Sequence, residues 1–186
     1  MKKGFFAKLA AENIKKNGKT YIPYIVTCIV TVMVFYIVKS LSVNPGLGNI
    51  AGGGFTRSAM QMGTWVVALF AVIFLFYTNS FLIKRRKKEI GVYNILGMGK
   101  RHIARMLIVE TGVTTAVTIG AGIIFGIIFS KLMYLILLRI LNYDIRMDFE
   151  FAMDTLIYTV VFFLVIFCMT LVYNLFQIQL ANPIEL

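Results

Sequence analysis

The segment "IKRRKKEIGVYNILGMGKRHIARM", residues 83–106, separates two long apolar runs and decides how the chain is divided. It opens with five consecutive cations, Lys84 to Lys88, and a second group of cations lies between residues 100 and 105. Cations at the ends of apolar runs are typical of membrane spans. The connection 84–105 is therefore predicted to lie outside the bilayer, between two spans.

The middle of this connection carries apolar side chains at helical spacing. Ile90, Tyr93 and Leu96 form a stripe of about two helical turns, and Gly97 and Gly99 favour the end of a helix there. An exposed apolar stripe on a short helix needs a partner groove, or it lies on the membrane surface. We expect a coupling helix that binds a partner, with the membrane surface as the alternative.

The composition identifies an integral membrane protein. The 186 residues are 59% hydrophobic, and the mean hydropathy is +0.83, whereas soluble domains are about half apolar or less. A membrane-spanning helix needs about 20 residues, and the apolar runs are continuous rather than alternating, which excludes a β-barrel pattern. We predict an all-α fold with four transmembrane helices, at about residues 20–41, 63–83, 106–138 and 155–176.

The distribution of cations predicts the orientation. Residues 1–19 hold six Lys and residues 84–105 hold eight Lys or Arg, whereas the connections 42–62 and 139–154 hold one and two. Cytoplasmic loops carry the excess of Lys and Arg, so we expect both termini and the connection 84–105 to be cytoplasmic. The same effect accounts for the net charge of +11, and no motif for nucleic-acid binding accompanies it.

The first nineteen residues have an amphipathic pattern. Phe5, Phe6 and Leu9 lie toward one side of a helix, with Lys8 and Glu12 largely opposite. A soluble amphipathic helix has the same pattern, but the span that follows favours a helix on the inner membrane surface.

The third span carries small residues four apart, a spacing that places each set on one helix face and lets another helix backbone approach closely. The pattern predicts tight packing within the chain or against a partner. The two sets are Gly112, Ala116 and Gly120, and Gly122, Gly126 and Ser130.

The third span also holds two charged residues, Glu110 and Lys131, 21 positions apart. That separation is about 31 Å along a helix, close to the thickness of the hydrocarbon layer. We therefore favour opposite interfaces, with both charged groups in the polar layers. One alternative is an acid with a function inside the membrane. Another is that Glu110 pairs with a cation such as Lys100 or Arg105 and so fixes the angle between the coupling helix and the span.

The chain shows no catalytic pattern, and we interpret it as a non-enzyme. The phosphate-binding pattern GxxxxGK[ST] is missing, and Gly97-Met98-Gly99 follows no strand. The single histidine, His102, and the two cysteines, Cys28 and Cys168, show no metal-ligand spacing. We expect neither a metal nor a cofactor in this chain.

The segment from the cation cluster to the third span resembles the signature of FtsX-type (MacB-like) ABC transporter permeases. In that family a basic span end leads into Glu-Ile-Gly, a leucine-glycine turn and a span with an early glutamate. The matching residues here are Lys84–Lys88, Glu89-Ile90-Gly91, Leu96-Gly97 and Glu110.

The resemblance implies a permease domain over residues 20–186 whose coupling segment docks on a cytoplasmic ATPase dimer, and that partner would hold ATP and Mg²⁺. The segments "NIKKNGKTYIPYIV" and "NPIEL" resemble the bacitracin-type (BceB-like) permeases. That subgroup implies handling of antimicrobial peptides bound to cell-wall lipids, and signalling through a sensor kinase. The implied coupling residues are Glu89, Ile90, Gly91, Tyr93, Leu96, Gly97 and Met98.

The four spans are similar to the N-terminal unit of a ten-span permease of this kind, or to a shortened homologue, in the bacterial plasma membrane. The partners that follow are the ATPase, membrane lipids, the rest of the permease and a sensor kinase. Two other hypotheses remain: a small scaffold membrane protein without transport, and an FtsX-like regulator of cell-wall hydrolases. The second is disfavoured by the short connection 42–62.

Overall fold

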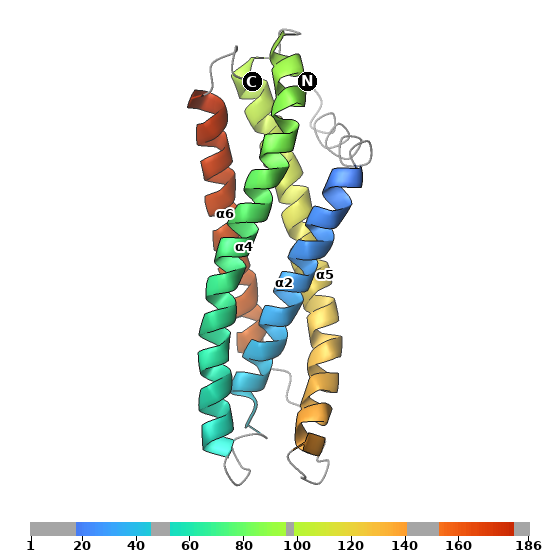
Figure 1. Cartoon of the computed structure of the whole chain (residues 1–186), viewed down its shortest axis with the longest axis vertical. Helices are drawn as coiled ribbons and strands as arrows, with labels where there is room; N and C mark the ends of the chain where they lie inside the picture. Colours follow the sequence, from blue (N-terminus) through green and yellow to red (C-terminus); the bar gives the residue numbers. More distant parts are fainter. Residues whose placement is uncertain (1–17, 46–52, 96–98, 141–152, 181–186) are drawn as a thin grey trace. The chain divides into compact units, whose positions relative to one another are not determined.

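The computed structural model describes residues 18–45, 53–95, 99–140 and 153–180, and within these ranges all regular structure is helical. Four helices follow one another along the chain (Figure 1). Each contains a stretch long and apolar enough to cross a membrane, as predicted. Their bounds are α2 (Gly18–Val43), α4 (Gly53–Ile95), α5 (Lys100–Ile140) and α6 (Met153–Leu180).

Helices are the form that an apolar chain must take in lipid, since every backbone N–H and C=O has to be bonded within the segment. Hydroxyl side chains follow the same requirement. Thr64, Thr78 and Thr159 each donate to the backbone carbonyl four residues earlier, at 2.9, 2.6 and 2.8 Å. Their polar groups are thereby satisfied inside the helix that carries them.

The helix α4 differs from the prediction in its length. The second span was expected at 63–83, with a separate coupling helix after it, but one helix runs from Gly53 to Ile95. No proline lies between Arg86 and Ile95, and the glycine in that stretch, Gly91, lies within the helix. The coupling segment up to Ile95 is therefore a continuation of the span, whereas Leu96, Gly97 and Met98 lie outside the described residues.

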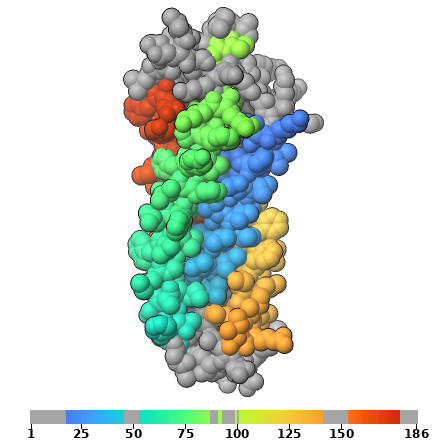
Figure 2. All heavy atoms as spheres, in the orientation of Figure 1, coloured from blue at the N-terminus to red at the C-terminus, as the bar shows by residue number. Residues whose placement is uncertain are grey.

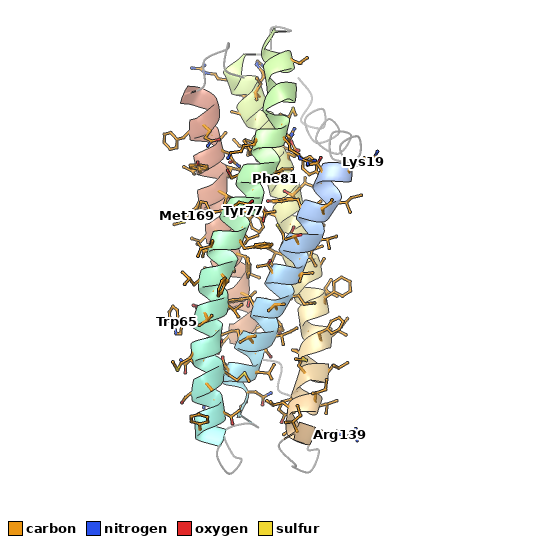
Figure 3. The ribbon with its side chains drawn as sticks, in the orientation of Figure 1. Lys19, Trp65, Tyr77, Phe81, Arg139 and Met169 are labelled. Carbon is orange, nitrogen blue, oxygen red and sulfur yellow. The ribbon has the colours of Figure 1, made fainter. Side chains whose placement is uncertain are left out.

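The N-terminal interfacial helix predicted at 1–19 lies almost wholly outside the described residues as well. Only Gly18 and Lys19 are described, and they begin α2 (Figure 3). That prediction stays a prediction.

The chain divides into two compact units, and each helix contributes to both. The first unit contains Met1–Thr27, Phe74–Val117 and Leu164–Leu186, and the second contains Cys28–Ile73 and Thr118–Phe163.

In the second unit, α2 contacts each of the other three helices. Gly122 and Gly126 of α5 face Val32 and Tyr36. Phe35 packs against two aromatic rings of α6, with its centroid 4.8 Å from that of Phe162 and 5.4 Å from that of Phe163. On the α4 side, Gly63 lies against Val38, and the two helices appear next to each other in the space-filling view (Figure 2).

The outward surface of α4 is apolar and aromatic. Trp65, Tyr77 and Phe81 follow one another along this helix (Figure 3), and their exposed fractions are 70%, 72% and 48%. On α6, Met169 is also largely exposed. In a membrane protein such a surface faces lipid or a neighbouring span. Of the two cysteines, Cys28 is buried and Cys168 is exposed.

Candidate functional site: a buried polar cluster at the start of the coupling segment

The inward face of α4 in the first unit carries polar groups at helical spacing. Asn79, Leu82, Ile83 and Arg86 are all buried, and steps of three, one and three place them on one side of the helix. The neighbouring Arg85 lies on the outward side, with its guanidinium 4.8 Å from the centre of the Phe81 ring. One cation of the Lys84–Lys88 run therefore turns into the protein while the preceding two remain exposed.

Arg86 forms an ion pair with Glu110 of α5. The Nη1 atom of Arg86 lies 2.7 Å from Oε2 of Glu110, and the two side chains are 4% and 2% exposed. The other carboxylate oxygen, Oε1, accepts a hydrogen bond from the hydroxyl of Tyr21 on α2. The guanidinium of Arg86 also lies over the Tyr21 ring, 5.4 Å from its centre. We name these three residues, Tyr21, Arg86 and Glu110, the buried polar cluster.

A second polar contact lies seven residues before Arg86 on α4. The side-chain amide of Asn79 donates to the Oδ1 atom of Asn174 on α6 at 3.1 Å, and both side chains are buried. Together with the buried polar cluster, this contact gives every helical segment of the first unit at least one polar partner on another helix.

The position of Glu110 corrects the favoured prediction. It was expected at the inner interface with its carboxylate in the polar layer, but it is 2% exposed and surrounded by protein. Pairing with a cation was one alternative, yet the partner is Arg86 on α4 rather than Lys100 or Arg105 on its own helix. Ionisable groups inside a membrane protein pair with one another because an isolated charge is costly there. Lys131, in contrast, is exposed.

The two sets of small residues on α5 have different surroundings. Gly122, Gly126 and Ser130 are buried, whereas Gly112, Ala116 and Gly120 are exposed. A methyl group added at Gly122 would lie 2.6 Å from Cβ of Val32, but one added at Gly112 or Gly120 would meet nothing within 4 Å. The set that contains Gly122 thus lies at a helix contact inside the chain, and the set that contains Gly112 does not.

The sequence-predicted coupling residues occupy the end of α4. Glu89, Ile90, Gly91 and Tyr93 all lie within the helix, Gly91 is buried, and the adjacent Val92 is 54% exposed. The next helix starts at Lys100, and the carbonyl of Gly99 accepts hydrogen bonds from the backbone N–H groups of His102 and Ile103. The connection from α4 to α5 is therefore four residues long.

The comparison with known proteins agrees with this architecture. The sequence model described as "FtsX-like permease C-terminal" matches residues 62–183, well over half of the chain. The chain belongs to the FtsX-like permease family. The matched range includes Arg86, Glu110 and the Asn79–Asn174 contact, while Tyr21 lies before it. Family membership and four apolar helices together indicate a multi-pass protein of the bacterial plasma membrane.

Individual relatives of this FtsX-like permease chain carry transporter names. It is 31% identical over 102 residues to the bacitracin export permease protein BceB of Halalkalibacterium halodurans. It is 30% identical over 103 residues to the BceB protein of Bacillus subtilis, and 30% over 104 residues to the uncharacterized ABC transporter permease YvcS of that organism. Each alignment covers 55% of this chain and 16% of the relative, so the similarity spans about one sixth of those proteins.

Sequence reasoning missed four residues of this region: Tyr21, Asn79, Arg86 and Asn174. Arg86 was grouped with its neighbours as an orientation signal, because a run of five cations does not show which side chain turns inward. The available signal was the spacing of Asn79 and Arg86, seven apart on an apolar helix and therefore on one face.

Proposed function

We propose that this FtsX-like permease chain couples a cytoplasmic ABC ATPase to work on the outer side of the membrane. Its family membership and the ABC permease names of its relatives support the proposal. In this proposal the ATPase binds the coupling segment, residues 89–99, and the spans carry the resulting movement through the membrane.

The observation that carries the proposal is the unbroken length of α4. Its 43 residues extend about 65 Å at 1.5 Å per residue, roughly twice the thickness of a hydrocarbon layer of about 30 Å. The helix must therefore project beyond the layer, and the cationic run Lys84–Lys88 marks where it leaves. A continuous helix transmits a push at its end to the span more directly than a flexible loop does.

The cation distribution supports a cytoplasmic position for this projecting end. Residues 1–19 and 84–105 together hold fourteen Lys or Arg, against three in the connections 42–62 and 139–154. We propose that both termini and the coupling segment face the cytoplasm, where an ATPase can reach them.

For the substrate, we propose peptide antibiotics or peptides bound to cell-wall lipids. The support is the name bacitracin export permease, which two relatives carry. The remaining proposed partners are membrane lipids, further permease segments and a sensor kinase. The nucleotide and Mg²⁺ would belong to the ATPase.

The test is capture of the ATPase by the tagged chain from detergent-solubilised membranes of its own bacterium, with bound ABC ATPase quantified by mass spectrometry and ATP hydrolysis. We expect capture with the wild type, and roughly thirtyfold weaker association for Tyr93→Ala, because a central aromatic anchor contributes about 2 kcal/mol. Lys87→Gln, two residues before the coupling segment, is the control, because in this proposal its charge lies at the rim of the interface, where a charge contributes little.

Two outcomes contradict the proposal at different points. If the wild-type chain captures no ABC ATPase, the coupling function is wrong. If ATPase is captured equally by wild type and Tyr93→Ala at matched expression, the function stands but the stripe lies on the membrane surface instead of in an ATPase groove.

A further inference from the structure

We infer that the buried polar cluster is a positioning device: Tyr21, Arg86 and Glu110 together fix the direction in which the coupling segment leaves the membrane span. The inference rests on the proposed function in one respect, namely that residues 89–99 are the contact for the ATPase. The geometry of the cluster itself does not depend on that partner.

The three contacts form a closed triangle across three helices. Glu110 uses one carboxylate oxygen for Arg86 of α4 and the other for Tyr21 of α2. The third side is the guanidinium of Arg86 over the ring of Tyr21. Because each residue contacts both others, a rotation or shift of any one helix breaks two of the three contacts.

Stability alone does not explain why this site is charged. Replacing a buried ion pair by apolar side chains of similar volume is often neutral or stabilising, because desolvation offsets the attraction between the charges. The Arg86–Glu110 ion pair at 2.7 Å is accompanied by a hydrogen bond from the Tyr21 hydroxyl to the other carboxylate oxygen. Unlike an apolar contact, a hydrogen bond to a charged group is directional, since it has a narrow range of distance and angle. The property that the cluster supplies is thus a defined arrangement of helices.

The cluster lies where it controls the projecting end of α4. Arg86 is the last residue of the apolar stretch, and the helix continues without a break to Ile95. Nine residues of helix extend about 14 Å, so a tilt of 10° at Arg86 displaces the end of α4 by roughly 2.4 Å. A shift of that size is enough to misplace a docking surface, since well-packed interfaces have the complementarity of protein interiors.

The experiment measures the direction of α4 without any ATPase. Nitroxide labels are placed at Val92 on α4 and Ile108 on α5, which are 54% and 46% exposed, in a background carrying Cys28→Ala and Cys168→Ser. The full chain is reconstituted in lipid nanodiscs, and the distance between labels is measured by double electron–electron resonance. We expect one narrow distance distribution for the chain with an intact cluster.

Glu110→Gln keeps the size of the side chain but removes its charge, so we expect the distribution to broaden or shift by about 2 Å or more. Tyr21→Phe removes one hydroxyl and leaves the ion pair in place, so it should fold normally and broaden the distribution less. The paired variant Arg86→Met with Glu110→Met should restore thermal stability without restoring the narrow distribution. Thr115→Val is the control, because this buried hydroxyl, five residues past Glu110 on α5, has no hydrogen-bond partner.

A merely structural role predicts that the paired methionine variant recovers both the stability and the narrow distribution. That result would overturn the inference even if Glu110→Gln fails to fold. An unchanged distance distribution in both Tyr21→Phe and the paired methionine variant would overturn it as well. The proposed function fails separately, through the absence of captured ATPase, and leaves these label distances unaffected.

Discussion

The contact between Gly122 of α5 and Val32 of α2 yields a quantitative prediction. An added Cβ would lie 2.6 and 2.7 Å from the Cβ and Cγ1 atoms of Val32, and 3.2 Å from the backbone oxygen of Ile29. Val32 is fully buried and β-branched, so its side chain has no alternative rotamer of low energy. Gly122→Ala therefore forces α2 and α5 apart by several tenths of an ångström or more.

The same chain provides a matched control at Gly120, two residues earlier on α5, where an added Cβ meets nothing within 4 Å. Both substitutions gain the same helix propensity of about 1 kcal/mol, so this gain cancels in their difference. What remains is the overpacking term at Gly122, typically about 1–3 kcal/mol. A free-energy difference of about 1.4 kcal/mol changes an equilibrium constant tenfold. The equilibrium constant for the opening of α2 away from α5 should therefore differ about 5- to 140-fold between the two variants.

The thiol of Cys28 reports this opening directly. Cys28 is fully buried on α2, one residue before Ile29, whereas Cys168 is exposed and is replaced by serine. We expect a maleimide to label Cys28 at least fivefold faster in Gly122→Ala than in Gly120→Ala, in detergent and at equal protein concentration. Equal labelling rates would refute the reasoning, because they would show that a methyl group added where α5 approaches α2 costs no more free energy than one added at Gly120.

Two further predictions concern orientation and the second polar contact. Cysteines introduced at Gly54 and Gly99, where an added side chain meets nothing within 4 Å, should react with an impermeant thiol reagent on intact cells only at Gly54; the reverse pattern would overturn the proposed orientation. Asn79→Leu leaves the amide of Asn174 buried without its partner, which should lower the free energy of unfolding by about 1–3 kcal/mol. Adding Asn174→Leu should recover most of that loss, and a double variant no more stable than the single one would contradict the assignment.

The sequence was sufficient for the fold because hydropathy acts along single segments. Each predicted span, such as 20–41 or 155–176, lies inside one observed helix, since about 20 apolar residues can satisfy their backbone in lipid only as a helix. The separate coupling helix after residue 83 was not found. The change from apolar to charged residues at Lys84 indicates where the chain passes from lipid to water, but it does not end the helix. Lys, Arg and Glu are good helix formers, so α4 continues through them.

The buried polar cluster could not be predicted in the same way, because its contacts depend on which helices are neighbours. Glu110 and Arg86 are each compatible with an exposed position at a membrane interface when considered alone. Only the packing of α2, α4 and α5 brings Tyr21, 89 residues away in the chain, to the carboxylate of Glu110. For the small residues of α5, periodicity identified two faces but not that one of them, containing Gly112, would be exposed.

The order of the cluster residues along the chain also has a consequence for biosynthesis. A chain enters the membrane from its N-terminus, and a carboxylate that enters lipid without a partner is costly. Tyr21 and Arg86 both precede Glu110, so the hydroxyl and the guanidinium have already been made when α5 emerges from the ribosome. We therefore expect the acid to find both partners during insertion, and a circularly permuted chain that makes α5 first to insert with lower yield.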